Sequence, residues 1–310
     1  NTLIYLLIMK LTMKKRDQIS GIAFVLLPII GIFLFVGVPL IVSLVLSFGH
    51  LSSFDIFDID FSDFGSNYVR IFTEDKKYIK AILNSFIYAI GTSLLQTVLS
   101  LLLAYFLSKP IKCRTLFRVI LFIPYVCSVV ALSLMWKWML DGNFGIINDL
   151  LMKMGLEKVD WLNNPNTSFM IMIIMSVWGG LGYGTILYTA ALSSVDKSLY
   201  EASEVDGASS FSKFLNITLP MISPTTFYIL VMGMIGNLQA FANFQVMNPI
   251  GKDGIIETMV YRVWWAAFEA DLMQYGIGYA SALGWVSGII IIVFTVVLFK
   301  TQKYWVYYDN

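Results

Sequence analysis

The sequence has little charge of either sign. Asp, Glu, Lys and Arg together make up 13% of its 310 residues and leave a net charge of +1, whereas about 25% of the residues in an ordinary soluble protein are charged. Hydrophobic residues make up 58% of the chain, and the mean hydropathy is +0.75. No basic block is present, so we expect no nucleic acid partner. The composition instead favours a protein that lies within a lipid bilayer.

Histidine and cysteine are almost absent. The one histidine, His50, excludes a metal site made of several histidines, and Cys113 and Cys127 do not have CxxC spacing. We interpret both cysteines as small buried hydrophobic residues. A P-loop is also missing, because Gly251-Lys252 lacks the earlier glycine and the following Ser or Thr. We therefore expect a chain without catalytic residues, metal ligands or a cofactor of its own.

Long apolar runs recur along the whole chain. About 20 apolar residues are enough for a helix to cross the hydrocarbon core of a bilayer. Six stretches have roughly this length and contain no Asp or Glu. They predict an all-α membrane protein with six transmembrane helices, at about 19–48, 79–107, 116–140, 168–192, 221–247 and 276–299.

The basic residues suggest which side of the membrane each connection faces. If the N-terminus is cytoplasmic, 12 of the 21 Lys and Arg residues lie on the cytoplasmic side, in the shorter segments. This bias predicts that both termini are cytoplasmic. We expect a cytoplasmic segment at 1–18, a membrane domain at 19–300 and a cytoplasmic tail at 301–310. Within the first segment, we treat 1–12 as a non-native or upstream-start extension. The predicted outer loop at 49–78 is acidic and aromatic, which suits either a solvated loop with interface anchors or contact with an external protein.

The segment 198–220, between the fourth and fifth predicted helices, looks like two short helices with a break. Ser198 and Glu201 have the spacing of a capping box, which predicts the start of the first helix. Gly207 can end that helix in a left-handed conformation. Ser209 or Ser210 can cap the second helix, and Pro220 falls where the fifth membrane helix would begin. We predict a short hairpin on the cytoplasmic side.

This segment resembles the coupling loop of binding-protein-dependent ABC importer permeases, in which Glu-Ala-Ala is followed after three residues by Gly and after nine more by Ile-x-Leu-Pro. Ser203 departs from the pattern, where the family has alanine. The run Asp206-Gly207-Ala208 is similar to the carbohydrate branch, the maltose-type and glycerol-3-phosphate-type permeases. The resemblance extends from about residue 19 to the C-terminus. The positions that match the family pattern are Glu201, Ala202, Gly207, Ile217, Leu219 and Pro220.

The resemblance implies a type I ABC importer permease fold with a coupling-helix hairpin at 194–220. It implies a non-catalytic subunit that acts with a second homologous permease, a cytoplasmic ATPase dimer that binds ATP and Mg, and an extracellular solute-binding protein, in a bacterial cytoplasmic membrane. The alternative for Glu201 is that it only caps its own helix. The residues expected to couple the chain to the ATPase are Glu201, Ala202, Asp206, Gly207, Ala208 and Phe211.

A solute site is expected from polar residues within the fourth and fifth predicted helices. Asn237 and Tyr183 resemble, by their distance from the loop, residues that contact the solute in maltose-type permeases. Helix geometry adds Gln239 and Asn243 as neighbours on one face, and Trp178 and Tyr188 offer further aromatic rings. Aromatic and amide groups together suit a sugar. The alternative is that these polar groups only form hydrogen bonds between helices.

Two other functions remain open at this stage. An ABC permease for a solute other than a sugar would have the same loop. An autonomous secondary transporter commonly carries ionisable residues at membrane depth. The absence of carboxylates from the predicted helices argues against it, although sodium sites can use backbone carbonyls.

Overall fold

A computed structural model describes residues 13–50, 59–110, 112–251, 254–270 and 276–307. The segment 1–12, predicted as a non-native or upstream-start extension, lies outside the described residues, as do 51–58 of the acidic, aromatic loop and Lys252. Most of the described chain is helical. The strands it contains are β1 (Ile250–Gly251) and β2 (Gly254–Ile255), which pair antiparallel. The predicted all-α class is confirmed.

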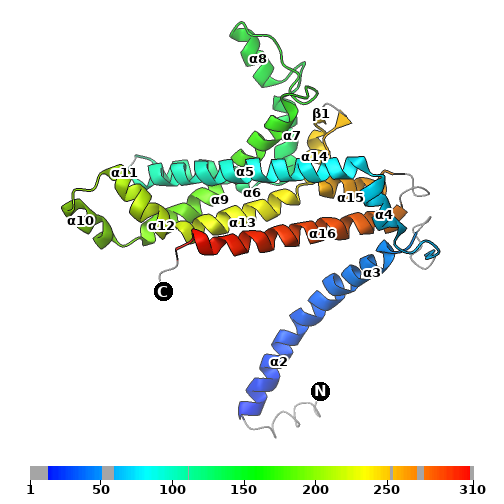
Figure 1. The fold of residues 1–310 in the computed structure, drawn as a ribbon. Coiled ribbons are helices and arrows are strands. Elements are labelled where there is room, and N and C mark those ends of the chain that lie inside the picture. The colour runs from blue at the N-terminus through cyan, green and yellow to red at the C-terminus, as the bar shows by residue number, and fades with distance from the viewer. Residues whose placement is uncertain (1–12, 51–58, 111, 252–253, 271–275, 308–310) are drawn as a thin grey trace, which may run out of the picture.

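Long helices lie side by side and form a bundle (Figure 1). They include α5 (Lys76–Ser108), α9 (Ser168–Ser194), α13 (Ser223–Leu238) and α16 (Gly276–Thr301). Helix α5 packs against both α9 and α13. At one end, α9 leads into the segment predicted as a hairpin, and we call this the hairpin end and the opposite one the far end.

The first membrane helix is an arm that leaves this bundle (Figure 1). It consists of α2 (Met13–Ile32), a π-helical stretch (Phe33–Gly37) and α3 (Val38–Ser47). Helix α3 packs against α16. Within the 28-residue span Ser20–Ser47, only 6% of the most apolar window is buried. The predicted length is confirmed, and most of this apolar surface is left uncovered by the chain itself.

The third and fifth predicted membrane helices are interrupted. Helix α6 (Arg114–Val126) and helix α7 (Val129–Met139) meet at a bend of 101°. Pro124, inside α6, lacks the N–H that would bond to the carbonyl four residues earlier, and Cys127 and Ser128 then adopt extended backbone angles.

The fifth helix stops at Leu238, and α14 (Ala242–Met247) forms after a break at 239–241. Four helices are long and apolar enough to cross a membrane, and the number rises to six if each strongly bent pair counts as one span. The structure thus allows four to six crossings where the apolar runs predict six, and its bent pairs are α6 with α7 and, at 64°, the segment Ser210–Met221 with α13. Apolar composition gives the length of a span and does not fix where its backbone bends.

The remaining helices are short and lie in the segments that connect the long helices of the bundle. Helix α7 and the segment that contains α8 stand away from the bundle (Figure 1). The short elements are α4 (Ser66–Thr73), α8 (Ile146–Lys153), α10 (Lys197–Val205), α11 (Ser210–Lys213), a π-helical turn (Phe214–Thr218), α12 (Leu219–Met221), α15 (Met259–Phe268) and a 3₁₀ turn (Gln302–Tyr304).

A buried ion cluster ties the far end of the bundle together. Asp75 caps α5 by accepting from the Tyr78 N–H, and its carboxylate also accepts from the Tyr279 hydroxyl at 2.7 Å. The guanidinium of Arg262, on α15, lies 3.3 Å from the same carboxylate and 3.6 Å from Glu257. Burial raises the pKa of the Glu257 carboxyl. One ion cluster thus connects α5, α15 and α16.

Both cysteines are exposed, so the interpretation of them as buried hydrophobic residues is wrong. Cys113 precedes α6 with φ +61°, and Cys127 lies at the break between α6 and α7. Each therefore falls at a helix boundary, where the chain is not covered by its neighbours.

Candidate functional site

The segment 197–221 forms a compact helical hairpin at one end of the bundle (Figure 1). Gly207 has φ +72°. The Ala208 N–H donates to the Ser203 carbonyl at 2.9 Å and the Gly207 N–H to the Glu204 carbonyl at 3.0 Å, the two bonds that close a helix in a Schellman motif. Gly207 ends α10 as predicted, because a left-handed backbone favours glycine.

The capping of the two hairpin helices is partly as predicted. Ser209 caps α11, accepting from the Ser212 N–H, which confirms one of the two predicted serines. The capping box of Ser198 with Glu201 is wrong, because α10 starts earlier. The Asp196 carboxylate accepts from the Ser198 N–H at 2.9 Å and caps the helix at that point, and a charged acceptor suits a helix N-terminus well.

Cross-links hold the hairpin in shape. The Lys213 ammonium donates to Glu204 at 2.8 Å, and this hydrogen bond lowers the pKa of the Glu204 carboxyl. The hydroxyls of Tyr200 and Thr218 are 2.9 Å apart. Tyr200 also packs against a buried cluster around Tyr188 and Ile222, at the base of the hairpin. The hairpin is thus fixed to the ends of the membrane helices.

The outer surface of the hairpin is left uncovered. Glu201, Ala202 and Asp206 are exposed, and Phe211 is 71% exposed. Val205, which sequence reasoning missed, is 90% exposed. In the described part of the chain, no hydrogen bond or ion pair of the Glu201 side chain is formed. An apolar and acidic surface of this kind suits a docking partner.

A cavity of about 680 Å³ lies in the bundle, at the two breaks in the third and fifth helices. Its wall comes from α5, α9 and α13 and from the chain around 124–129 and 239–243. Every residue in the wall is uncharged. The predicted solute residues Tyr183, Asn237, Gln239 and Asn243 all belong to this wall.

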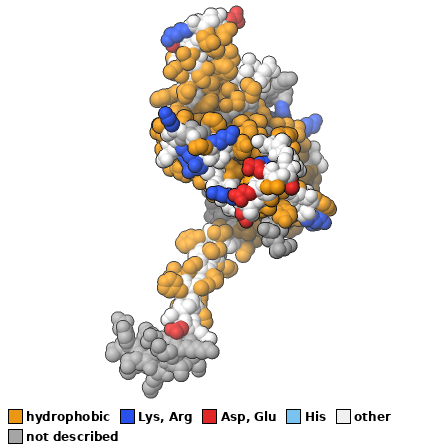
Figure 2. All heavy atoms as spheres, turned by 90° about the vertical axis from the view of Figure 1, so that its left-hand side faces the viewer, with side chains coloured by type: hydrophobic (Ala, Val, Ile, Leu, Met, Phe, Trp, Pro, Cys, Tyr) orange, Lys and Arg blue, Asp and Glu red, His pale blue; other side chains and the backbone are white. Residues whose placement is uncertain are grey.

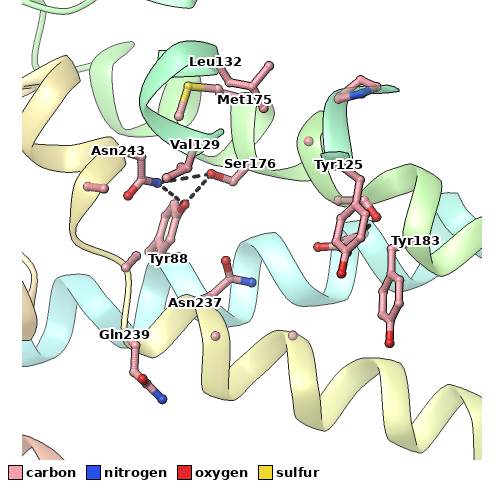
Figure 3. Close-up of a pocket in the computed structure, with 18 of the residues that line it drawn as sticks. Tyr88, Tyr125, Val129, Leu132, Met175, Ser176, Tyr183, Asn237, Gln239 and Asn243 are labelled. Carbon is pink, nitrogen blue, oxygen red and sulfur yellow. Dashed lines mark hydrogen bonds between the residues drawn. The ribbon is translucent and has the colours of Figure 1, made fainter. Parts of the chain in front are cut away.

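Asn243 belongs to a buried polar group at one side of the cavity (Figure 3). Its amide donates to the Tyr88 hydroxyl at 2.7 Å, and the Tyr88 and Ser176 hydroxyls bond to each other. Tyr88 and Ser176 were not predicted, since a lone tyrosine or serine in an apolar run carries no distinctive spacing. Asn237 donates to the Ser93 hydroxyl at 3.0 Å.

At the other side of the cavity two aromatic rings are stacked (Figure 3). The rings of Tyr183 and Tyr125 lie 4.9 Å apart at an interplanar angle of 15°. Tyr125 is the last residue but one of α6, directly before the break in the third helix, and was also not predicted. Amide and hydroxyl groups on one side and aromatic faces on the other give the cavity a mixed polar and apolar wall.

Some of the predicted neighbours are separated. Gln239 is exposed and points away from the Asn243 group in Figure 3, because the helix on which the two were expected to share a face ends at Leu238. Tyr188 is fully buried in the cluster at the base of the hairpin, and Trp178 packs against Trp136. Neither of these two aromatics lines the cavity.

One glycine is needed for the shape of the cavity. A Cβ at Gly180 would collide with the side chain of Gln96, which donates to the Gly180 carbonyl at 3.0 Å. The glycine therefore lets a polar side chain of α5 lie against the backbone of α9, at the wall of the cavity.

Comparison with known proteins gives consistent matches. Residues 96–305 match the family described as the inner membrane component of binding-protein-dependent transport systems. The chain is 32% identical to a probable ABC transporter permease protein, YesP, of Bacillus subtilis, over 96% of this chain and 94% of that one. It is 31% identical to the arabinooligosaccharides transport system permease protein AraP of the same organism, over 76% and 74% of the two chains.

Solved structures show a similar fold. A bacterial ABC transporter involved in the import of the acidic polysaccharide alginate superimposes with a TM-score of 0.74, at 22% identity, over 93% of this chain and 96% of that chain. At this identity the likeness establishes the fold alone, and it confirms the expected importer permease fold.

Proposed function

We propose, because this chain belongs to the family of inner membrane components of binding-protein-dependent transport systems, that it forms half of the pathway by which an ATP-driven importer moves a carbohydrate. The chain is a membrane-spanning ABC permease subunit, and it is not itself the catalyst.

The uncharged wall of the larger cavity supports a neutral, hydroxyl-rich solute. A sugar presents apolar ring faces and hydroxyl edges, and ring faces stack on aromatic side chains while amides bond to hydroxyls. The stacked pair of Tyr183 and Tyr125 and the amides of Asn237 and Asn243 offer both kinds of contact. A charged solute would find no charged partner in this wall, and burial of an unpaired charge is costly. Relatives whose names specify arabinooligosaccharides and lactose agree with this choice.

The exposed hairpin supports attachment to a cytoplasmic ATPase dimer, which would bind ATP and Mg. Phe211 and Val205 present apolar surface, and Glu201, one helical turn before Val205, is exposed and forms no ion pair with the described residues. Because Tyr200 of the hairpin packs against the buried cluster around Tyr188 and Ile222, at the ends of α9 and α13, movement of the hairpin would be transmitted to the bundle. The hairpin end would therefore face the cytoplasm of a bacterial cell, with both termini on that side, and the far end would face an extracellular solute-binding protein.

A second, homologous permease would complete the pathway. The arm formed by α2 and α3 leaves its apolar side chains exposed. This exposure is accounted for if a related chain covers the arm.

The observation that carries the proposal is the exposed hairpin, and co-purification tests it. The tagged chain is extracted in mild detergent from cells that express the neighbouring transport genes, as wild type, as Glu201→Ala and as Glu157→Ala. Glu157 is an equally exposed glutamate between α8 and α9, away from the hairpin. We expect the wild type and Glu157→Ala to retain an ATPase and a second permease, and Glu201→Ala to lose the ATPase while keeping the permease. A wild-type chain that purifies alone and transports sugar in vesicles without ATP would contradict the proposal.

A further inference from the structure

A second cavity, of about 390 Å³, lies between α6 and α9 at the hairpin end. Arg114 and Arg118 line it from the first turns of α6, and its other wall comes from the last two turns of α9, including Thr189 and Ser193. No Asp or Glu lines this cavity. It is separate from the larger cavity, with which it shares no residue.

The two arginines of this cavity have buried donors without acceptors. The Nε atoms of Arg114 and Arg118 are both buried and make no hydrogen bond within the described residues. The nearby hydroxyls of Thr189 and Ser193 donate to the carbonyls one turn earlier in α9, at 2.7 and 2.8 Å. A buried donor without an acceptor is unfavourable, and a guanidinium fits an oxyanion with several parallel bonds. The cavity is therefore suited to an anion with several oxygens.

The surroundings favour an anion that carries hydrocarbon. Phe117 of α6, between the two arginines in sequence, is about half exposed, and Ile186 of α9, also exposed, lines the cavity itself. Figure 2, which faces the hairpin end, shows Lys and Arg side chains gathered beside apolar ones on this surface. An acyl chain can lie along such a helix face while its head group reaches the arginines. A free anion would make no use of the apolar part.

We infer that this cavity binds the phosphate group of an anionic phospholipid. Basic pockets between membrane helices on the cytoplasmic side are suited to anionic head groups, because the inner leaflet carries them. The inference goes beyond the transport function, and only its sidedness rests on the orientation proposed above. The bound lipid would also fill the gap between α6 and α9 at the point where α9 continues into the hairpin.

Lipid titration of the purified, delipidated full-length chain tests this site. The apparent Kd is measured by native mass spectrometry for phosphatidylglycerol and for phosphatidylcholine, with the wild type, the double variant Arg114→Gln/Arg118→Gln, and Lys112→Gln. Lys112 is an exposed neighbour that does not line the cavity, so it controls for loss of basic charge alone. We expect the wild type and Lys112→Gln to prefer phosphatidylglycerol by about tenfold or more, and the double variant to lose that preference.

Other results would overturn the inference. Equal affinity of the wild type for the two lipids would exclude an anion-selective lipid site. A preference that persists in the double variant would place the lipid elsewhere. Strong competition by inorganic phosphate, without retention of lipid, would mean that the cavity holds a free anion. If the double variant does not fold, the two single glutamine variants are used, and each is expected to weaken phosphatidylglycerol binding when Lys112→Gln does not.

Discussion

At the scale of single residues, two asparagines of the fifth helix have different tasks although both line the larger cavity. Asn243 is 5% exposed and bonds to the Tyr88 hydroxyl. Asn237 is half-buried, with one bond to Ser93. The first has the environment of a residue that holds the fold around the cavity, and the second has the environment of one that can still reach a solute.

Replacement of each asparagine by alanine separates these tasks. We expect Asn243→Ala to destabilise the chain by about 1–3 kcal/mol, because a buried hydrogen-bond partner of Tyr88 is removed. We expect Asn237→Ala to change the KM for uptake of neutral disaccharides, with a change in stability of less than about 1 kcal/mol. Thermal unfolding in detergent and uptake by vesicles measure the two effects. Equal loss of stability in both variants would mean that Asn237 only links helices.

The arginines of the chain also differ in their surroundings. Arg262 is buried but faces two carboxylates, so its charge is compensated within the chain. Arg114 and Arg118 line a cavity without a carboxylate. Arg262 is therefore suited to an ion pair within the chain, whereas Arg114 and Arg118 are suited to an external anion. The surroundings of the arginines, and not the residue type, make this difference.

At the scale of elements, the hairpin at 197–221 depends on one left-handed residue, Gly207. An ordinary residue at φ +72° costs about 1–2 kcal/mol, and asparagine tolerates this conformation better. A Cβ at Gly207 would meet no atom within 4 Å. Substitution there strains the backbone without a clash inside the chain.

We therefore expect Gly207→Val to abolish solute-stimulated ATPase activity and transport, and Gly207→Asn to retain most of both. The strained turn moves the exposed docking surface, while insertion into the membrane is unchanged. The assembled transporter in nanodiscs, with its binding protein, gives the measurement.

Gly155→Val is the matched control for this variant. Gly155 also has a positive φ, of +77°, with open space around it, and it follows α8 instead of the hairpin. If it impairs coupling as strongly as Gly207→Val, the effect is one of general stability, and the hairpin is not the coupling element.

At the scale of the whole molecule, the arm of α2 and α3 carries apolar side chains that the chain itself leaves uncovered. Phe35, in the π-helical stretch of the arm, is 82% exposed, and Phe24 is 87% exposed. Lipid could cover such side chains, but a second permease would cover them as well and would close the pathway at the same time.

A photo-reactive amino acid at Phe35 distinguishes these two coverings. We expect it to cross-link to the second permease when the two chains are expressed together. The same substitution in the chain expressed alone is the control and should give no protein cross-link. Cross-links to lipid alone in the assembled transporter would show that the arm does not join the two permeases.

Much of the architecture follows from local chemistry that the sequence displays directly. Apolar length predicts the four continuous spans, because a membrane helix must satisfy its own backbone within one segment. The turn at Gly207 and the cap at Ser209 are equally local, since each depends on one residue and its neighbours along the chain. The family pattern around Glu201 and Gly207 identified the kind of protein for the same reason.

The cavities were decided by the tertiary structure. Tyr88, Tyr125 and Ser176 come from three different helices and carry no spacing that sets them apart in the sequence. Gln239 and Asn243 do not share a helix face, because the helix is interrupted between α13 and α14. A hydropathy pattern does not reveal such an interruption. The unpaired donors of Arg114 and Arg118 appear only once α9 is packed against α6. The sequence by itself determined the spans, the hairpin and the family, because these depend on neighbours along the chain, whereas packing between distant segments decided what each cavity offers to a ligand.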